Sequence, residues 1–213
     1  MTKFVNLGEL SSAADMENAI CEMARVLSMG GVVLHPTETC YGLAASALNG
    51  EAVKKIYKIK GRSFHNPVNI CVYDEVMATL YGDFPVKLLD LTRSYWPGPL
   101  TVLVERADCL PEFLNPGEQR VGIRVPGDDF FREVIGRVGA PIVSTSANVA
   151  GENEIYMADL DVFPLHVRDL VDLVVDRGVI PFKKPSTIVG VDESGHLTVL
   201  REGEIDMSKD QRH

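Results

Sequence analysis

Short β-rich apolar runs alternate with amphipathic helical segments along this chain, and glycine or proline stands at the junctions. Glycine and proline are strong signals for the turns and loops that separate such elements. Apolar spacing predicts a helix that ends before Gly30 and further helices over 49–61, 85–96 and 128–139. Strands are predicted over 31–37, 67–73, 99–106, 119–126, from Pro141, and over 171–178, 186–192 and 196–203.

Interleaved strands and helices are typical of α/β proteins, in which helices cover the faces of a partly parallel sheet. The last two strands are joined by Glu193, Ser194 and Gly195 and predict an antiparallel hairpin. We therefore expect an α/β fold with a twisted mixed parallel and antiparallel sheet flanked by helices. Its 213 residues with 46% hydrophobic content suit one domain over residues 1–213. The segment from Asn148 to His166 predicts a surface loop.

Charge and composition exclude several classes of protein. The net charge of -9 argues against a surface that binds nucleic acid by general phosphate attraction, so any positive site must be local. The N-terminus lacks a signal-peptide pattern and no apolar run is long enough for a membrane span, which predicts a soluble cytoplasmic protein. The four cysteines form no CxxC pair and predict reduced core thiols, with no structural metal.

The usual catalytic fingerprints are missing. The sequence contains no GxxxxGK[ST] or GxGxxG loop for nucleotide phosphates, no GxSxG or SxxK nucleophile and no HExxH zinc pair. His35, His65, His166 and His196 are scattered, so no histidine is selected as catalytic.

Three groups of polar residues stand at the ends of predicted strands or helices, where open α/β sheets place ligand sites. They are Thr37, Glu38 and Thr39; Lys60, Arg62, Ser63 and Asn66; and Arg120 with Arg124. Each group has a plainer explanation: a polar turn, cations favoured at a helix C-terminus, and exposed charge at a sheet edge. Arg62, however, lies past the helix stop at Gly61, where a guanidinium suits a polyphosphate or a carboxylate.

The stretch PIVSTSANVAG carries a strand out of the core into hydroxyl and amide groups. Ser144, Ser146 and Asn148 alternate, which predicts three neutral hydrogen-bonding groups on one side of the strand end. An ordinary Ser-Asn turn or helix cap is the alternative. Taken with the cationic groups, the pattern predicts a cavity lined by cations and hydroxyls.

Seven motifs occur in one order along the chain: PTETCYGL, KGRSFHNP, WPGPLT, GIRVP, STSAN, KPST and LREG. In this order and spacing the chain resembles the YrdC/TsaC family of threonylcarbamoyl-AMP synthases from about Gly30 to Gly203. The resemblance implies a nucleotidyltransferase with a concave positive cavity. Its substrates would be L-threonine, bicarbonate or CO2, and ATP with Mg2+, and its products threonylcarbamoyl-AMP and pyrophosphate. That reaction begins a tRNA modification that a separate threonylcarbamoyl transferase completes, and direct contact with tRNA is left open.

The resemblance also assigns residues by motif position. The ATP-binding set is Lys60, Arg62, Asn66, Ser146, Asn148 and Arg201, of which Lys60 and Arg62 steady the phosphates in catalysis. The set for threonine and carbamate is Thr39, Arg124, Ser144 and Ser186. Arg120 lies where some members contact nucleotide.

The chain departs from the family pattern at Ser63, at Cys71, where others often place a histidine near threonine, and in VAGENEIYMADL after the SAN motif. With no second domain beyond His213, it resembles the short form. Two alternatives are a carbamoyl transferase like the related domain of the hydrogenase maturation protein HypF, and an RNA-binding module without turnover. The acidic net charge counts against the RNA-binding module.

Overall fold

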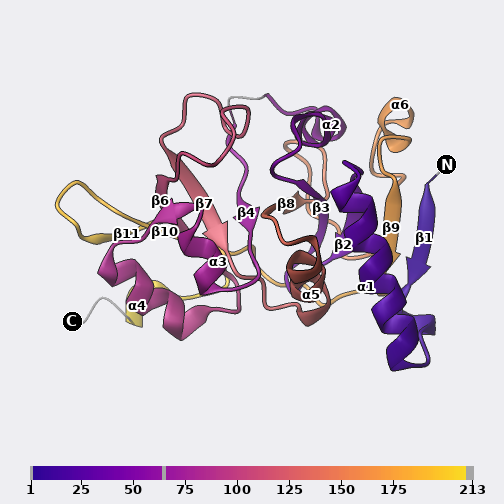
Figure 1. Ribbon diagram of the computed structural model, residues 1–213, viewed down its shortest axis with the longest axis horizontal. Helices are drawn as coiled ribbons and strands as arrows, with labels where there is room; N and C mark the ends of the chain where they lie inside the picture. The colour runs from indigo at the N-terminus through magenta and orange to yellow at the C-terminus, as the bar shows by residue number, and fades with distance from the viewer. Residues whose placement is uncertain (1, 64–65, 210–213) are drawn as a thin grey trace.

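The computed structural model describes residues 2–63 and 66–209, whose strands all belong to one sheet (Figure 1). The strands are β1 (Lys3–Asn6), β2 (Val33–Pro36), β3 (Tyr41–Ser46), β4 (Ile70–Cys71), β5 (Gly82–Asp83), β6 (Leu100–Arg106), β7 (Arg120–Arg124), β8 (Ile142–Ser146), β9 (Leu173–Asp176), β10 (Thr187–Val191) and β11 (Leu197–Arg201). The helices are α1 (Ala13–Ser28), α2 (Gly50–Lys60), α3 (Glu75–Thr79), α4 (Val86–Tyr95), α5 (Asp129–Val138) and α6 (Leu165–Arg168), with short 3-10 turns η1 (Leu7–Glu9) and η2 (Met207–Lys209).

The strand order across the sheet is β1-β9-β2-β3-β8-β4-β7-β6-β10-β11, and β5 pairs with β6 beside this path. Four neighbouring pairs are parallel, namely β1 with β9, β2 with β9, β4 with β7, and β6 with β10. The remaining pairs are antiparallel, including the terminal β10–β11 hairpin. The predicted mixed α/β sheet is therefore confirmed.

The helix boundaries follow from local capping chemistry. Ser12 and Asp15 form a reciprocal capping box at the start of α1. The Asn49 side chain accepts from the backbone N–H of Ala52 at the start of α2, and Gly61 ends that helix at φ 58°, a left-handed conformation that favours glycine. The predicted helix over 49–61 is confirmed, and its last residue, Lys60, is buried against the sheet.

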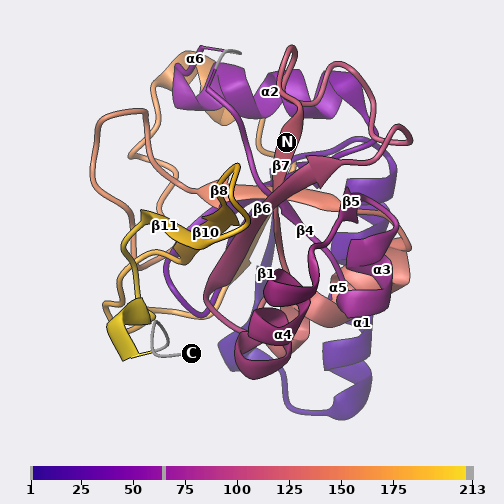
Figure 2. The same ribbon diagram turned by 90° about the vertical axis from the view of Figure 1, so that its left-hand side faces the viewer.

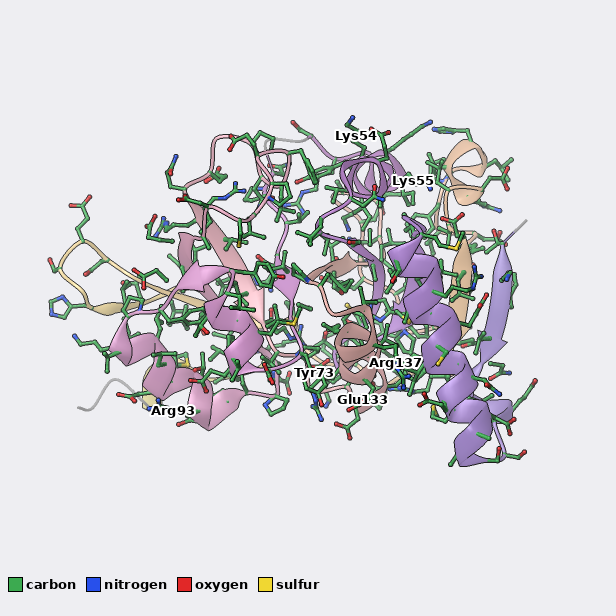
Figure 3. All side chains as sticks on the ribbon, viewed as in Figure 1. Lys54, Lys55, Tyr73, Arg93, Glu133 and Arg137 are labelled. Carbon is green, nitrogen blue, oxygen red and sulfur yellow. The ribbon has the colours of Figure 1, made fainter. Side chains whose placement is uncertain are left out.

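Helices cover both faces of the sheet. In Figure 2, α2 and α6 lie on one side and α1 and α5 on the other. Alternate strand residues divide accordingly: Val33 and Ile142 pack in the cluster that includes α1 and α5, whereas Leu34 and Val143 pack in the cluster that includes α2. Tyr73 lies near α5, as Figure 3 shows. Gly136 on α5 leaves room for its ring, because an added Cβ there would lie 2.8 Å from a Tyr73 ring carbon.

The structure differs from the sequence-based expectation at several strands. β3 was not expected, because its Gly and Ala residues lack both β-propensity and alternation, yet all six of its residues are buried between β2 and β8. β1, α3 and β5 were also not expected, and β4 is only two residues long. The loop predicted after β8 is confirmed up to α6. In the described part of the chain, no helix has the length and apolar character needed to span a bilayer.

Candidate active site

A cavity of about 440 Å³ opens on the face of the sheet that α1 and α5 cover elsewhere. On β8, Ile142 packs under those helices, while Ser144 and Ser146, on the same face by alternation, line the cavity. Its other walls come from the turn between β2 and β3, the loop after α2, strands β6 and β7, and the β10–β11 hairpin.

Most of the predicted site residues meet at this cavity. They are Thr39, Arg62, Arg124, Ser144, Ser146, Ser186 and Arg201, which come from six separate parts of the chain. Three arginines and one carboxylate, that of Glu154, line the cavity, so its lining is locally positive in an acidic protein. Arg120, on the same face of β7 as Arg124, is exposed and does not line the cavity.

Arg124 is the most deeply placed cation of the cavity. Its side chain is 12% exposed and forms an ion pair with Glu38, whose side chain is 16% exposed. Its Nε donates to the Gly98 carbonyl at 3.1 Å. Burial acts to raise the pKa of Glu38, but Arg124 and the Gly127 backbone N–H outweigh it and hold the pKa below its ordinary value. The pair fixes the guanidinium at the cavity wall.

Arg201 reaches the cavity from the edge strand β11. It donates from Nε and Nη2 to the Ser186 carbonyl at 3.1 and 2.7 Å and from Nη2 to Ser186 Oγ at 3.0 Å. The Ser186 hydroxyl lies 2.8 Å from that of Thr101. Burial is the larger cause of a lowered pKa at Arg201, and the positive charge of Arg124 is the second cause. The guanidinium nevertheless stays charged. The hairpin thus brings a cation and a hydroxyl to the cavity together.

Thr39 belongs to a compact turn between β2 and β3. The Thr37 hydroxyl accepts the backbone N–H groups of Thr39 and Cys40 at 3.1 and 3.2 Å and lies 3.0 Å from the Thr39 hydroxyl. The plainer explanation of this group, a polar turn after Pro36, describes the local structure, and Thr37 and Thr39 also line the cavity.

Lys60 does not line the cavity but ties the end of α2 to the segment after β8. Its ammonium donates to the Ser146 carbonyl and, at 3.0 Å each, to the carbonyl and Oδ1 of Asn148. The Lys60 carbonyl also accepts the Ala150 N–H at 2.9 Å. Burial, and next the positive charge of Arg62, lower the pKa of Lys60 to about 8.

The strand on which the expected alternation depends ends two residues before Asn148. β8 stops at Ser146, so Asn148 leaves the strand and turns inward instead of lining the cavity beside Ser144 and Ser146. Its Oδ1 accepts from Ser146 Oγ at 2.6 Å, and its Nδ2 donates to the Glu152 carbonyl. The interpretation of three groups pointing one way is therefore wrong for Asn148, which supports the cavity wall from behind.

The loop after α2 holds the remaining predicted residues. Arg62 lines the cavity and donates to the Pro67 carbonyl at 3.2 Å. Asn66 is exposed and does not line the cavity. His65, one of the scattered histidines, and its neighbour Phe64 lie outside the described residues.

Several lining residues were not selected from the sequence. Asn69, Thr101 and Glu154 stand in ordinary strand or loop patterns that carry no signal of their own. Cys71 lines the cavity next to Ser144, and burial raises the pKa of its thiol to about 12. Cys40 and Cys71 are buried as expected, but Cys21 and Cys109 are exposed, so the prediction of core thiols is wrong for those two.

His35 lies directly behind the cavity wall, fully buried on β2. Its Nδ1 is 3.0 Å from the Pro36 carbonyl, its Nε2 is 3.4 Å from Ser144 Oγ, and its ring lies 4.1 Å from that of Phe131. Burial lowers the pKa of His35 from 6.5 to about 4, against the opposing effect of the Asp128 carboxylate.

This shift predicts a pH-dependent loss of stability. Between pH 6.5 and about 4 the unfolded chain binds a proton at His35 that the folded protein does not, so stability falls as the pH drops through this range. From pH 7.5 to pH 5 the His35 contribution is about 2 kcal/mol. Urea unfolding measured at pH 7.5 and at pH 5 gives the loss of stability between them. This loss should be about 2 kcal/mol smaller in His35→Phe than in the wild-type protein. Equal losses in the two proteins would contradict a buried neutral histidine.

In the described residues, no cluster of three His, Cys, Asp or Glu side chains could hold a metal ion. The cavity is lined by cations and hydroxyls, which suit anionic ligands, and by the carboxylate of Glu154.

Comparison with known proteins shows which family this chain resembles. The Sua5/yciO/yrdC family model, described as "Telomere recombination", matches residues 25–203. A Methanocaldococcus jannaschii protein provisionally named threonylcarbamoyl-AMP synthase is 34% identical over 183 residues, 84% of this chain and 83% of that protein. The threonylcarbamoyl-AMP synthase of Bacillus subtilis is 38% identical over 154 residues, 70% of this chain and 43% of that protein.

The crystal structure of Pyrococcus abyssi Sua5 complexed with L-threonine has the same fold, with a TM-score of 0.82 and 26% identity over 99% of this chain and 59% of that chain. This chain thus spans less than two thirds of the Bacillus and Pyrococcus proteins. The matched range 25–203 includes every residue that lines the cavity. The chain belongs to the Sua5/YciO/YrdC family.

Proposed function

We propose that this chain is a nucleotidyltransferase that makes threonylcarbamoyl-AMP from L-threonine, bicarbonate or CO2, and ATP, with release of pyrophosphate. The observation that carries the proposal is the cavity itself, which gathers Arg62, Arg124 and Arg201 with several hydroxyls in a chain of this family. The names of the Methanocaldococcus and Bacillus relatives and the threonine complex of Pyrococcus Sua5 support the same activity.

The reaction needs positioning and charge stabilisation more than a protein nucleophile. The threonine amine adds to CO2 to give a carbamate and a proton, and a carbamate oxygen then attacks the α-phosphorus of ATP as pyrophosphate leaves. Holding the reactants in line and offsetting charge on the phosphate oxygens account for most of the catalysis in such transfers. A cavity lined by three arginines and neutral hydroxyls supplies both.

The proposed roles divide the cavity between two substrates. Arg124, fixed by Glu38, pairs with the threonine carboxylate or the carbamate, and Thr39, Ser144 and Ser186 orient the amino acid. Arg62 and Arg201 bind ATP, with Ser146 beside them.

The three predicted ATP ligands outside the cavity lining take part in a different way. Lys60 and Asn148 hold the segment that carries Ser146, and the Lys60 ammonium adds positive charge behind the phosphates. Lys60 and Arg62 remain the proposed phosphate-steadying pair. Asn66, exposed after α2, would reach ATP from the loop that also carries Arg62.

Mg2+ is proposed to enter with ATP, bound to its phosphates. The described residues offer no all-protein metal cage, which fits an ion that keeps waters and binds through substrate phosphates with one or two carboxylates. Glu154 is the lining carboxylate that can supply an oxygen. Bound there, Mg2+ would neutralise charge on the phosphate oxygens.

We also propose that residues 1–213 act as one domain in the cytoplasm, where free thiols such as Cys40 and Cys71 persist. The product would pass to a separate threonylcarbamoyl transferase complex that modifies tRNA. Direct tRNA contact, if it occurs, would be confined to the positive cavity, because the chain as a whole carries a charge of -9.

A pyrophosphate-release assay tests the function. The purified protein with ATP, Mg2+ and bicarbonate should release pyrophosphate when L-threonine is added and stay near background without it. Release that needs carbamoyl phosphate in place of threonine and bicarbonate would support the HypF-like alternative. Tight RNA binding with no release under any of these conditions would support the RNA-binding module. Either result would overturn the proposal.

A further inference from the structure

We infer that buried His35 fixes the hydroxyl of Ser144 as a hydrogen-bond acceptor toward the cavity, so that Ser144 recognises a donor group of the bound amino acid. His35 would then be a positioning residue that sets selectivity without touching the substrate. The inference deepens the proposed function and rests on it for the identity of the ligand.

The contact between His35 and the Pro36 carbonyl determines which atoms donate and which accept in the hydrogen bonds from Pro36 through His35 to Ser144. His35 Nδ1 lies 3.0 Å from the Pro36 carbonyl oxygen, which can only accept, so the ring proton sits on Nδ1. In the neutral ring Nε2 then carries a lone pair and no proton. Its neighbour at 3.4 Å is Ser144 Oγ, whose single proton is therefore donated to His35.

The Cys71 thiol completes the surroundings of Ser144. Ser144 and Cys71 interact through their side chains. If the serine proton is directed to His35, the protonated thiol is the partner left to donate, weakly, to the serine oxygen. With its proton given to His35, Ser144 has only lone pairs to offer a ligand. A carboxylate or phosphate oxygen, which also offers only lone pairs, is not held there, whereas an N–H or O–H group is.

Gly42 makes the close approach of His35 and Ser144 feasible. It pairs with His35 across β2 and β3 and lines the same cavity. A Cβ at this position would lie 3.2 Å from His35 Nε2 and 3.3 Å from Ser144 Oγ. Both atoms would have to move by a few tenths of an ångström to admit it. The missing side chain at Gly42 therefore leaves the space in which the two polar atoms meet.

L-Threonine offers two donors that this acceptor could hold, the amino group and the side-chain hydroxyl. Calorimetric titration should compare three ligands: L-threonine, L-2-aminobutyrate, which lacks the hydroxyl, and (R)-3-hydroxybutanoate, which lacks the amine. In the wild-type protein, loss of the donor held at Ser144 should weaken binding about threefold to tenfold. The analogue that shows this loss identifies the donor.

Three variants test the role of His35. In His35→Phe the preference for L-threonine over that analogue should shrink at least about threefold, because Ser144 is free to rotate and to donate. His35→Gln should restore the preference, since its amide oxygen can accept from Ser144. Gly42→Ala, with every polar group retained, should reduce the preference in the same direction as His35→Phe. Thermal melts identify any variant that has unfolded.

The outcomes separate this inference from the proposed function. An unchanged preference in both His35→Phe and Gly42→Ala would overturn the role of His35, even if the wild-type protein releases pyrophosphate normally. Loss of preference in His35→Phe that Gln does not restore would indicate a packing role and would also overturn it. Absence of threonine-dependent pyrophosphate release in the wild-type protein would overturn the proposed function, and the binding preferences would still report on Ser144.

Discussion

Replacing Arg124 with alanine is expected to lower the kcat/KM of pyrophosphate release for L-threonine at least about a hundredfold. The guanidinium lines the cavity, is nearly buried and would form charge-assisted hydrogen bonds to the carboxylate or the carbamate. Steady-state kinetics with varied threonine measure the loss. Arg120→Ala is the matched control. Arg120 lies at the other end of β7, on the same face as Arg124, but is exposed and outside the cavity. Near-normal turnover of Arg124→Ala would refute the assignment.

The same change should also destabilise the fold. Glu38 would keep a nearly buried carboxylate without its ionic partner, and its Oε2 already has no hydrogen-bond partner among the described residues. Breaking one side of a buried pair costs roughly 3–5 kcal/mol. The double variant Glu38→Gln/Arg124→Ala should recover part of this stability without recovering activity. That pattern would show that the lost turnover does not come from unfolding alone.

Lys60→Met is expected to lower the kcat/KM for ATP by about a hundredfold and the free energy of unfolding by roughly 2–4 kcal/mol. Methionine keeps the apolar stem but removes the ammonium that serves three oxygen atoms of Ser146 and Asn148. The segment that positions the Ser146 hydroxyl would lose its attachment to α2. Varied-ATP kinetics and urea unfolding give the two quantities.

Lys58→Met provides the control for the lysine prediction. Lys58 lies one half-turn earlier on α2 and is exposed, so its replacement should leave both quantities close to wild type. If Lys60→Met retained the wild-type kcat/KM for ATP and the wild-type stability, the buried ammonium would have neither of the roles assigned to it.

Sequence reasoning succeeded where local chemistry decides the structure. The end of α2 at Gly61 follows from helix spacing and a left-handed glycine. The gathering of Arg62, Arg124 and Ser144 was expected because polar groups at strand and helix ends meet at one edge of an open sheet.

It failed where a contact depends on partners distant in the chain. Nothing in the sequence near Asn148 indicates that Lys60, 88 residues earlier, would draw the amide away from the cavity. The strand β3 was missed because its small residues are specified by burial between two neighbours, not by their own propensity. His35 was not selected from the sequence, because its interactions depend on the Pro36 carbonyl and the Ser144 hydroxyl, and the contact with Ser144 cannot be read from the sequence.

The placement of Ser186 and Arg201 on the terminal hairpin has a consequence for protein synthesis. Because β10 pairs in parallel with β6 and β11 pairs beside it, the cavity acquires these two residues only after the segment up to Arg201 has been synthesised. A nascent chain that has already paired β2, β3 and β8 would expose an unfinished cavity with one wall missing. The cavity is therefore complete only once the β10–β11 hairpin has joined the sheet.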